Sequence, residues 1–134
     1  MSMKNSDLWR IGIIGAGMIA GKHVRDLLGT RRCAIATVAD KIPKLAQAMA
    51  AAHGIEKTTE DYREILEDRS IDAVVIATPP WTHKDIFLDA LDADAVAGDR
   101  AGGHQVVEGG EGFRVVVNAR RQAMELDQVQ AIHL

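Results

Sequence analysis

Short apolar runs alternate with stretches of helical periodicity over residues 10–91. Each run stops at a glycine, an aspartate or a proline-containing break, which is typical of a fully buried strand. The runs predict strands at Arg10–Ile14, Ala34–Ala39 and Ile71–Ala77. The stretches between and after them predict amphipathic helices at Ile19–Leu28, Lys44–His53 and Lys84–Leu91. Strands separated by helices of roughly ten residues indicate βαβ units and a parallel sheet.

Glycine and proline mark the ends of two of these helices. Gly29 ends the first helix and Gly54 ends the second. Pro43 suits the first turn of the second helix. An N–H group at that position has no partner within the helix, and proline has no N–H to leave unpaired.

A shorter unit is predicted before the last of these strands. Ile55–Thr58 is an extended piece that counts as the third strand, so Ile71–Ala77 is the fourth. A doubly wound sheet with the strand order 3-2-1-4, helices on both faces and right-handed crossovers is expected. Thr58 or Thr59 is expected to cap the intervening helix. That helix is expected to carry Glu60 and Asp61 in its first turn and to turn Tyr62, Ile65 and Leu66 inward.

The pattern weakens after Asp92. Six of the 12 glycines fall between Gly98 and Gly112. Candidate strands at Gln105–Val107 and Phe113–Val117 and a candidate helix at Ala119–Gln130 follow. The chain is therefore divided into an N-terminal tail (1–9), a domain (10–91) and a remainder (92–134). The remainder is either a divergent completion of the domain or an irregular tail.

Composition agrees with a single α/β domain. The chain has 134 residues, of which 47% are hydrophobic, 26% charged and only 4% aromatic, which suits helices packed on a sheet better than a β-sandwich. The net charge of −3 gives no reason to expect nucleic acid or an anionic membrane as a partner. The lone cysteine, Cys33, excludes an intramolecular disulfide framework and a multi-cysteine metal site.

A cytoplasmic location is expected, because no segment is long enough to cross a membrane. The apolar run Ile11–Gly21 has an alternative reading as a signal peptide. Asp7 lies in what would be the basic region of that peptide, and the glycines of the run have a better explanation.

The glycines form the sequence Gly15-Ala-Gly-Met-Ile-Ala20, which follows the first strand and opens the first helix. It matches G-x-G-x-x-G/A. In that motif Gly15 permits the tight turn, Gly17 lets a pyrophosphate approach the backbone, and Ala20 lets the helix pack close to the strand. The helix N-terminus offers free N–H groups and a partial positive charge to phosphates.

Asp40 strengthens the prediction, because it ends the second strand at the place where a carboxylate accepts ribose hydroxyls. A carboxylate there repels a 2′-phosphate, so NAD is expected in preference to NADP. Lys41 next to it softens that preference and keeps NADP as an alternative. The competing interpretation is a close-packed turn followed by an aspartate that only caps the next helix.

Four segments in order closely resemble the N-terminal part of the glucose–fructose oxidoreductase, inositol dehydrogenase and MocA (Gfo/Idh/MocA) family. They are Arg10–His23, Val38–Asp40, Asp61–Leu66 and Ile71–His83. The resemblance implies a Rossmann-type, doubly wound sheet and an NAD(P)-dependent oxidoreductase acting on a sugar, cyclitol or related polyol.

The resemblance also implies roles for individual residues. The pyrophosphate would be held by Gly15, Gly17, Met18, Ile19 and Ala20, and the adenosine ribose by Asp40 beside Lys41. Thr78, Pro79 and Pro80 would lie at the crevice beyond the fourth strand, with Trp81 and His83 beside it. No catalytic residue is assigned: His83 is the one candidate for a base, but a structural role in capping or orienting the loop is favoured for it. Trp81 has the alternative of packing on the next helix as a lid residue. His23 and Cys33 are expected to pack in the core.

The chain departs from the family after residue 91. The family's next landmark is a strand ending in Glu-Lys-Pro, and the resemblance implies that its lysine contacts the substrate and assists proton transfer. The nearest match here is Glu108 followed by two glycines. No lysine follows Lys84. The family's substrate domain is not recognisable, and the oligomeric state cannot be carried over. The expectation is a truncated oxidoreductase that is not catalytic alone. The alternatives are a non-catalytic dinucleotide-binding sensor or partner module, and a chain that works with a separately encoded catalytic domain.

Overall fold

The computed structural model describes residues 8–96, 105–108 and 114–117. The strands of this part are β1 (Trp9–Ile14), β2 (Cys33–Ala39), β3 (Lys57–Thr59), β4 (Ala73–Ile76), β5 (Gln105–Glu108) and β6 (Arg114–Val117). The helices are α1 (Met18–Gly29), α2 (Pro43–His53), α3 (Arg63–Glu67) and α4 (His83–Val96), with a 3-10 turn, η2 (Pro80–Thr82), before α4. Strands and helices alternate from β1 to α4, as the sequence predicts.

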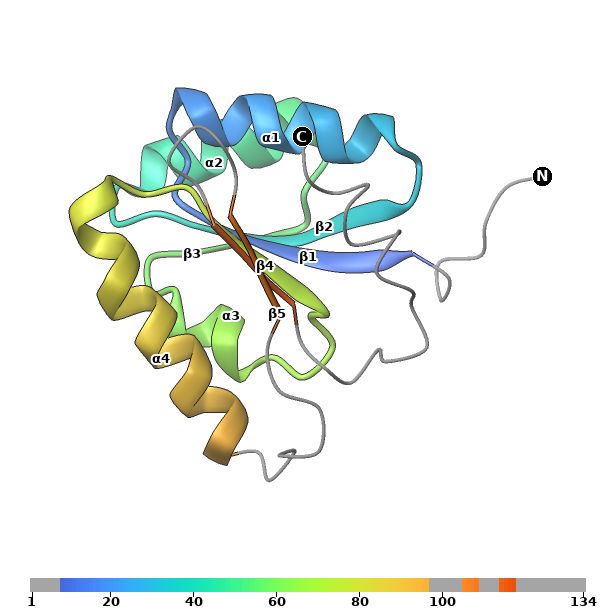
Figure 1. The fold of residues 1–134 in the computed structure, drawn as a ribbon. Helices are drawn as coiled ribbons and strands as arrows, with labels where there is room; N and C mark the ends of the chain where they lie inside the picture. Colours follow the sequence, from blue (N-terminus) through green and yellow to red (C-terminus); the bar gives the residue numbers. More distant parts are fainter. Residues whose placement is uncertain (1–7, 97–104, 109–113, 118–134) are drawn as a thin grey trace.

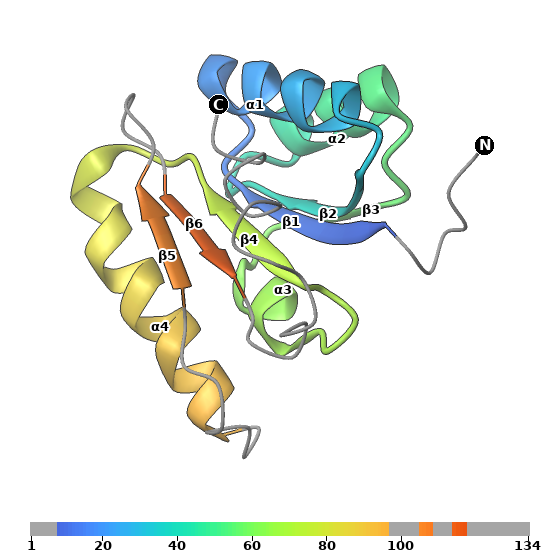
Figure 2. The same cartoon turned by 45° about the vertical axis from the view of Figure 1, so that its right-hand side comes forward.

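One six-stranded sheet runs through the molecule in the order β3-β2-β1-β4-β6-β5. The pairs β1–β2, β1–β4 and β2–β3 are parallel, which confirms the predicted order 3-2-1-4. The candidate strands of the glycine-rich region become β5 and β6. Both pair antiparallel, β6 with β4 and β5 with β6 (Figure 2). The candidate helix at 119–130 lies outside the described residues.

Helices cover both faces of the sheet. Figure 1 shows α1 and α2 on one face and α3 and α4 on the other. Because strand residues alternate between faces, β1 supplies both cores. Ile11 and Ile13 pack with Val24 and Leu27 of α1, whereas Ile14 packs with the cluster that contains Ile65. The arrangement is the doubly wound α/β fold that the sequence predicts.

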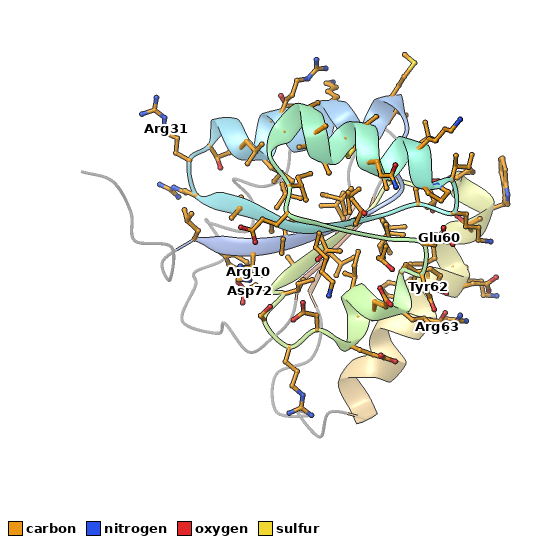
Figure 3. All side chains as sticks on the ribbon, turned by 180° about the vertical axis from the view of Figure 1, so that it is seen from behind. Arg10, Arg31, Glu60, Tyr62, Arg63 and Asp72 are labelled. Carbon is orange, nitrogen blue, oxygen red and sulfur yellow. The ribbon has the colours of Figure 1, made fainter. Side chains whose placement is uncertain are left out.

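Several element ends differ from the predicted ones. β4 begins at Ala73 instead of Ile71. The preceding Asp72 is bound to β1, since its N–H donates to the Arg10 carbonyl oxygen and its carboxylate accepts the Arg10 N–H, both at 2.8 Å (Figure 3). α4 runs to Val96 instead of ending at Leu91. α2 agrees closely, with Pro43 in its first turn and Gly54 in the left-handed conformation at its end.

The prediction that Thr58 or Thr59 caps α3 is wrong. The N-cap position belongs to Tyr62, and Thr59 ends β3. Asp61 precedes the helix, as Glu60 does, and its carboxylate accepts the Arg63 N–H at 3.0 Å. Ile65 is buried and Leu66 half-buried, as predicted for the inward side. The threonines are displaced from capping because pairing with β2 continues to Thr59, so the chain must turn before the helix starts.

Candidate functional site

The carboxyl ends of the parallel strands bring three turns together at one edge of the sheet. The turn after β1 begins at Gly15, whose N–H donates to the Ala39 carbonyl oxygen at 2.7 Å. The turn after β4 begins at Ala77, whose N–H donates to the Ile14 carbonyl oxygen at 2.8 Å. Ligands of open α/β sheets bind at this edge, beside the point where the strand order reverses. Here β1 is that point, since its neighbours are β2 and β4.

Gly15 occupies a position that only glycine fills without strain. Its φ of +103° lies in a region that L side chains rarely adopt. A Cβ added there would also stand 2.9 Å from the carbonyl carbon and oxygen of Ala77. The first glycine of the motif therefore serves the turn itself, as the sequence predicts.

Gly17 is a glycine for a different reason. It is the N-cap of α1, with an ordinary extended conformation (φ −81°, ψ −170°). A Cβ added to Gly17 would meet no atom within 4 Å. The space beside this backbone is open, so the fold itself does not require glycine here.

The start of α1 can hold an anion. No side chain caps the helix at Gly17, and the N–H groups of the first turn lack acceptors within the helix. Met18 is 94% exposed and Ile19 is 47% exposed, whereas Ala20 is fully buried against the sheet. A dinucleotide pyrophosphate fits this arrangement, because it needs backbone N–H groups, a positive helix end and no side chain in its way.

Asp40 lies in the second turn and is half-buried. Its Oδ2 accepts the Ala16 N–H at 2.9 Å, and its Oδ1 accepts the Ile42 N–H at 2.8 Å. The carboxylate therefore joins the turn after β1 to the turn after β2. The bond to Ile42 is local to the turn and does not cap α2, because Ile42 is itself the N-cap of that helix and no side chain caps it. The bond to Ala16 was missed, since it joins residues that come together only through the pairing of β1 with β2. Lys41 beside it is exposed.

The third turn is held by two threonines. The Thr82 hydroxyl lies 2.6 Å from the Thr78 hydroxyl and 2.7 Å from the Pro79 carbonyl oxygen. Thr82 was not among the predicted site residues, although its spacing of four from Thr78 is compatible with such a turn. Trp81 is 79% exposed, so it does not pack on α4 as a lid. His83 is the first residue of α4, and Pro80 the first of η2.

The remaining candidates lie away from this edge or in the core. His23 and Cys33 are both buried, as predicted. Burial raises the pKa of the Cys33 thiol above its ordinary value. Glu108 ends β5, which β6 separates from β4. Among the described residues there is no group of three His, Cys, Asp or Glu side chains able to hold a metal ion. Within the same part of the chain, no helix is long and apolar enough to span a membrane.

Comparison with known proteins agrees with this geometry. A family model described as the oxidoreductase family, NAD-binding Rossmann fold, matches residues 9–96. Inositol 2-dehydrogenase of Rhizobium meliloti (strain 1021) is 43% identical over 78 residues, covering 58% of this chain and 23% of that protein. The scyllo-inositol 2-dehydrogenase (NAD(+)) of Bacillus subtilis (strain 168) is 37% identical over 84 residues, covering 62% of this chain and 25% of that protein.

A solved structure gives the same result. Levoglucosan dehydrogenase in complex with NADH superimposes with a TM-score of 0.60 and 29% sequence identity, covering 64% of this chain and 25% of that one. The chain spans about a quarter of the length of the relatives it matches. The chain belongs to the Gfo/Idh/MocA oxidoreductase family and carries its NAD-binding Rossmann domain.

Proposed function

We propose that this chain binds NAD at the carboxyl edge of the sheet as the cofactor-binding part of a polyol dehydrogenase. The observation that carries the proposal is the open backbone at Gly17, where an uncapped helix begins beside an unfilled space. A turn that serves only the fold does not need an uncapped helix that begins beside open backbone. A pyrophosphate requires it.

The proposal assigns the predicted residues to the two ends of the cofactor. Gly15, Gly17, Met18, Ile19 and Ala20 form the pyrophosphate cradle. Asp40 accepts the adenosine ribose hydroxyls beside Lys41, and its negative charge favours NAD over NADP. Thr78, Pro79, Pro80 and His83 border the nicotinamide end. Bound NAD supplies a hydride acceptor at the nicotinamide ring, while the residues of the chain bind and orient it.

The proposed substrate is a sugar or cyclitol hydroxyl. The support is that the relatives are dehydrogenases of inositol, scyllo-inositol and levoglucosan. Hydride transfer also needs a positioned base and a pocket for the carbon. No lysine follows Lys84 in this sequence, so the proposal assigns the substrate pocket to a further domain. We place the protein in the cytoplasm, where a free thiol such as that of Cys33 is kept reduced.

Calorimetric titration of NAD into wild-type protein and Gly17→Val tests the cofactor assignment. The new side chain would fill the space proposed for the pyrophosphate, so we expect NAD binding to be lost while the thermal unfolding midpoint is kept. Gly21→Ala is the matched control, because a Cβ there also meets no atom within 4 Å but lies in the body of α1. Equal NAD affinity in wild type and Gly17→Val would refute the assignment.

A further inference from the structure

The contacts of Asp40 point to a role beyond that of a ribose contact. Of the three residues of the first turn, Gly15 and Ala16 are each bound to the end of β2. The Gly15 N–H is bound by the backbone of Ala39, and the Ala16 N–H by the side chain of Asp40. Gly17 follows directly and opens the helix. Within the segment that forms the cradle, the Ala16 N–H is therefore held by one carboxylate.

The same carboxylate is itself held in place. The Ile42 N–H donates to Oδ1, while the Ala16 N–H donates to Oδ2. The side chain therefore joins its own turn, which follows β2, to the turn after β1, which lies 24 residues earlier in the sequence. Hydrogen bonds from N–H groups to an ionised carboxylate are shorter and stronger than bonds between neutral groups. Each carboxylate oxygen has a second lone pair, which leaves capacity for a ribose hydroxyl.

We propose that Asp40 is a positioning residue for the pyrophosphate cradle, acting through the Ala16 N–H, in addition to its proposed contact with the ribose. The inference rests on the proposed function, because it concerns the same cofactor site. One side chain, that of Asp40, thereby couples the adenosine end of the cofactor to its phosphate end. Loss of the carboxylate weakens binding of phosphates even when the ligand carries no ribose hydroxyls.

The experiment pairs a protein change with a ligand change. ADP carries the pyrophosphate and both ribose hydroxyls, whereas 2′,3′-dideoxy-ADP lacks the two hydroxyls and is otherwise the same molecule. Both ligands are titrated into wild-type protein, Asp40→Asn and Asp68→Asn, with binding followed by NMR. Asp68→Asn is the matched control, since Asp68 also accepts a backbone N–H two residues on, from Ser70, but lies after α3 at the opposite edge of the sheet.

Asp40→Asn keeps the shape of the side chain but leaves only one oxygen for two N–H donors. We expect dideoxy-ADP to bind about tenfold more weakly to Asp40→Asn than to wild type, the usual scale for one hydrogen bond to a charged group. ADP is expected to lose more than this, because its hydroxyl contacts are lost as well. Asp68→Asn is expected to bind both ligands as wild type does.

A second readout needs no ligand. Hydrogen exchange at the Ala16 amide is expected to accelerate in Asp40→Asn, while exchange in the body of α1 is unchanged. Unchanged dideoxy-ADP binding in Asp40→Asn, with or without a loss for ADP, would overturn the positioning role and leave the proposed function standing. Failure of wild-type protein to bind ADP and NAD would overturn the proposed function and the inference together.

Discussion

At the scale of single residues, the two glycines of the turn after β1 obey different constraints. Gly15 has a positive φ and lies against the backbone of Ala77, so the folded chain itself excludes a side chain. Gly17 has an ordinary φ and open space, so only a ligand would exclude one. Stability and cofactor affinity are therefore separable within three residues.

Gly15→Ala is expected to destabilise the protein. The backbone conformation alone costs about 1–3 kcal/mol for a residue with a Cβ, and the approach to the Ala77 carbonyl adds to it. Chemical denaturation should show a lower free energy of unfolding for Gly15→Ala. Gly21→Ala should raise it by about 1 kcal/mol, because alanine is favoured over glycine inside a helix. A Gly15→Ala protein as stable as wild type would contradict the strained turn.

At the scale of elements, α3 is attached at both of its sides. A Cβ added at Gly12 of β1 would clash with the Cγ2 of Ile65, so α3 sits directly on the strand backbone. On its other side, the Tyr62 hydroxyl donates to the Asp89 carboxylate of α4. Arg63 lies 5.4 Å above the Tyr62 ring (Figure 3). Its guanidinium is 3.7 Å from the Asp89 carboxylate. This short helix depends on such contacts, because five residues are too few to be stable alone.

Gly12→Ala is expected to cost about 1–3 kcal/mol of stability, the usual penalty for overpacking a core. Ile65→Ala alone should cost about 2–5 kcal/mol through the cavity it leaves. The double variant should cost less than the sum of the two, because the second change removes the atom that the first one meets. Equilibrium unfolding of all four proteins measures this coupling. Strict additivity would show that the two residues do not touch.

Tyr62 should make the protein sensitive to alkali. Burial, followed by the hydrogen bond to Asp89 and the charge of that carboxylate, raises the pKa of Tyr62 from 10.0 to about 12. A raised folded-state pKa means that the neutral phenol is favoured in the folded protein. This contribution is complete below pH 10 and is lost as the pH rises toward 12.

The measurement is simple because Tyr62 is the single tyrosine of the chain. Phenolate absorbance should titrate above the ordinary range in wild type and closer to it in Asp89→Asn. Tyr62→Phe should remove the corresponding loss of stability between pH 10 and 12. An ordinary titration of Tyr62 in folded wild-type protein would sink the prediction.

At the scale of the whole molecule, the cofactor edge and the remainder of the sheet behave differently. Three of the four parallel strands, β1, β2 and β4, carry the turns of the site. Beyond β4 the sheet continues antiparallel through β6 to β5. The family match ends at residue 96, before either of these strands. Cofactor binding is therefore a property of the first part of the chain.

A polypeptide of these 134 residues is expected to bind NAD but to oxidise no sugar or cyclitol. A positioned general base contributes typically about 10²–10⁴-fold to the rate, and the family's lysine has no counterpart after Lys84. NADH formation with inositols and levoglucosan is the assay. A steady rise of NADH absorbance that is lost in His83→Ala would overturn this expectation and identify His83 as the base.

Local patterns were sufficient to predict the alternating elements and the glycine turn. Apolar runs that stop at Gly15 and Asp40 predict buried strands, because a parallel sheet covered by helices must exclude polar groups. The strand order 3-2-1-4 is that of a doubly wound sheet with right-handed crossovers and helices on both faces. The cap of α3 was mispredicted, because pairing with β2 retains Thr59 in β3.

Local sequence patterns identify which residues form the turn and why Gly15 is a glycine. The extension of α4 to Val96, the antiparallel pairing of β6 and β5 and the bond between Asp40 and Ala16 depend on tertiary packing. Periodicity and turn chemistry act over a few neighbouring residues, so they are visible in the sequence. The bond from Ala16 to Asp40 spans 24 residues and exists because β1 and β2 are paired in register, which no local pattern contains.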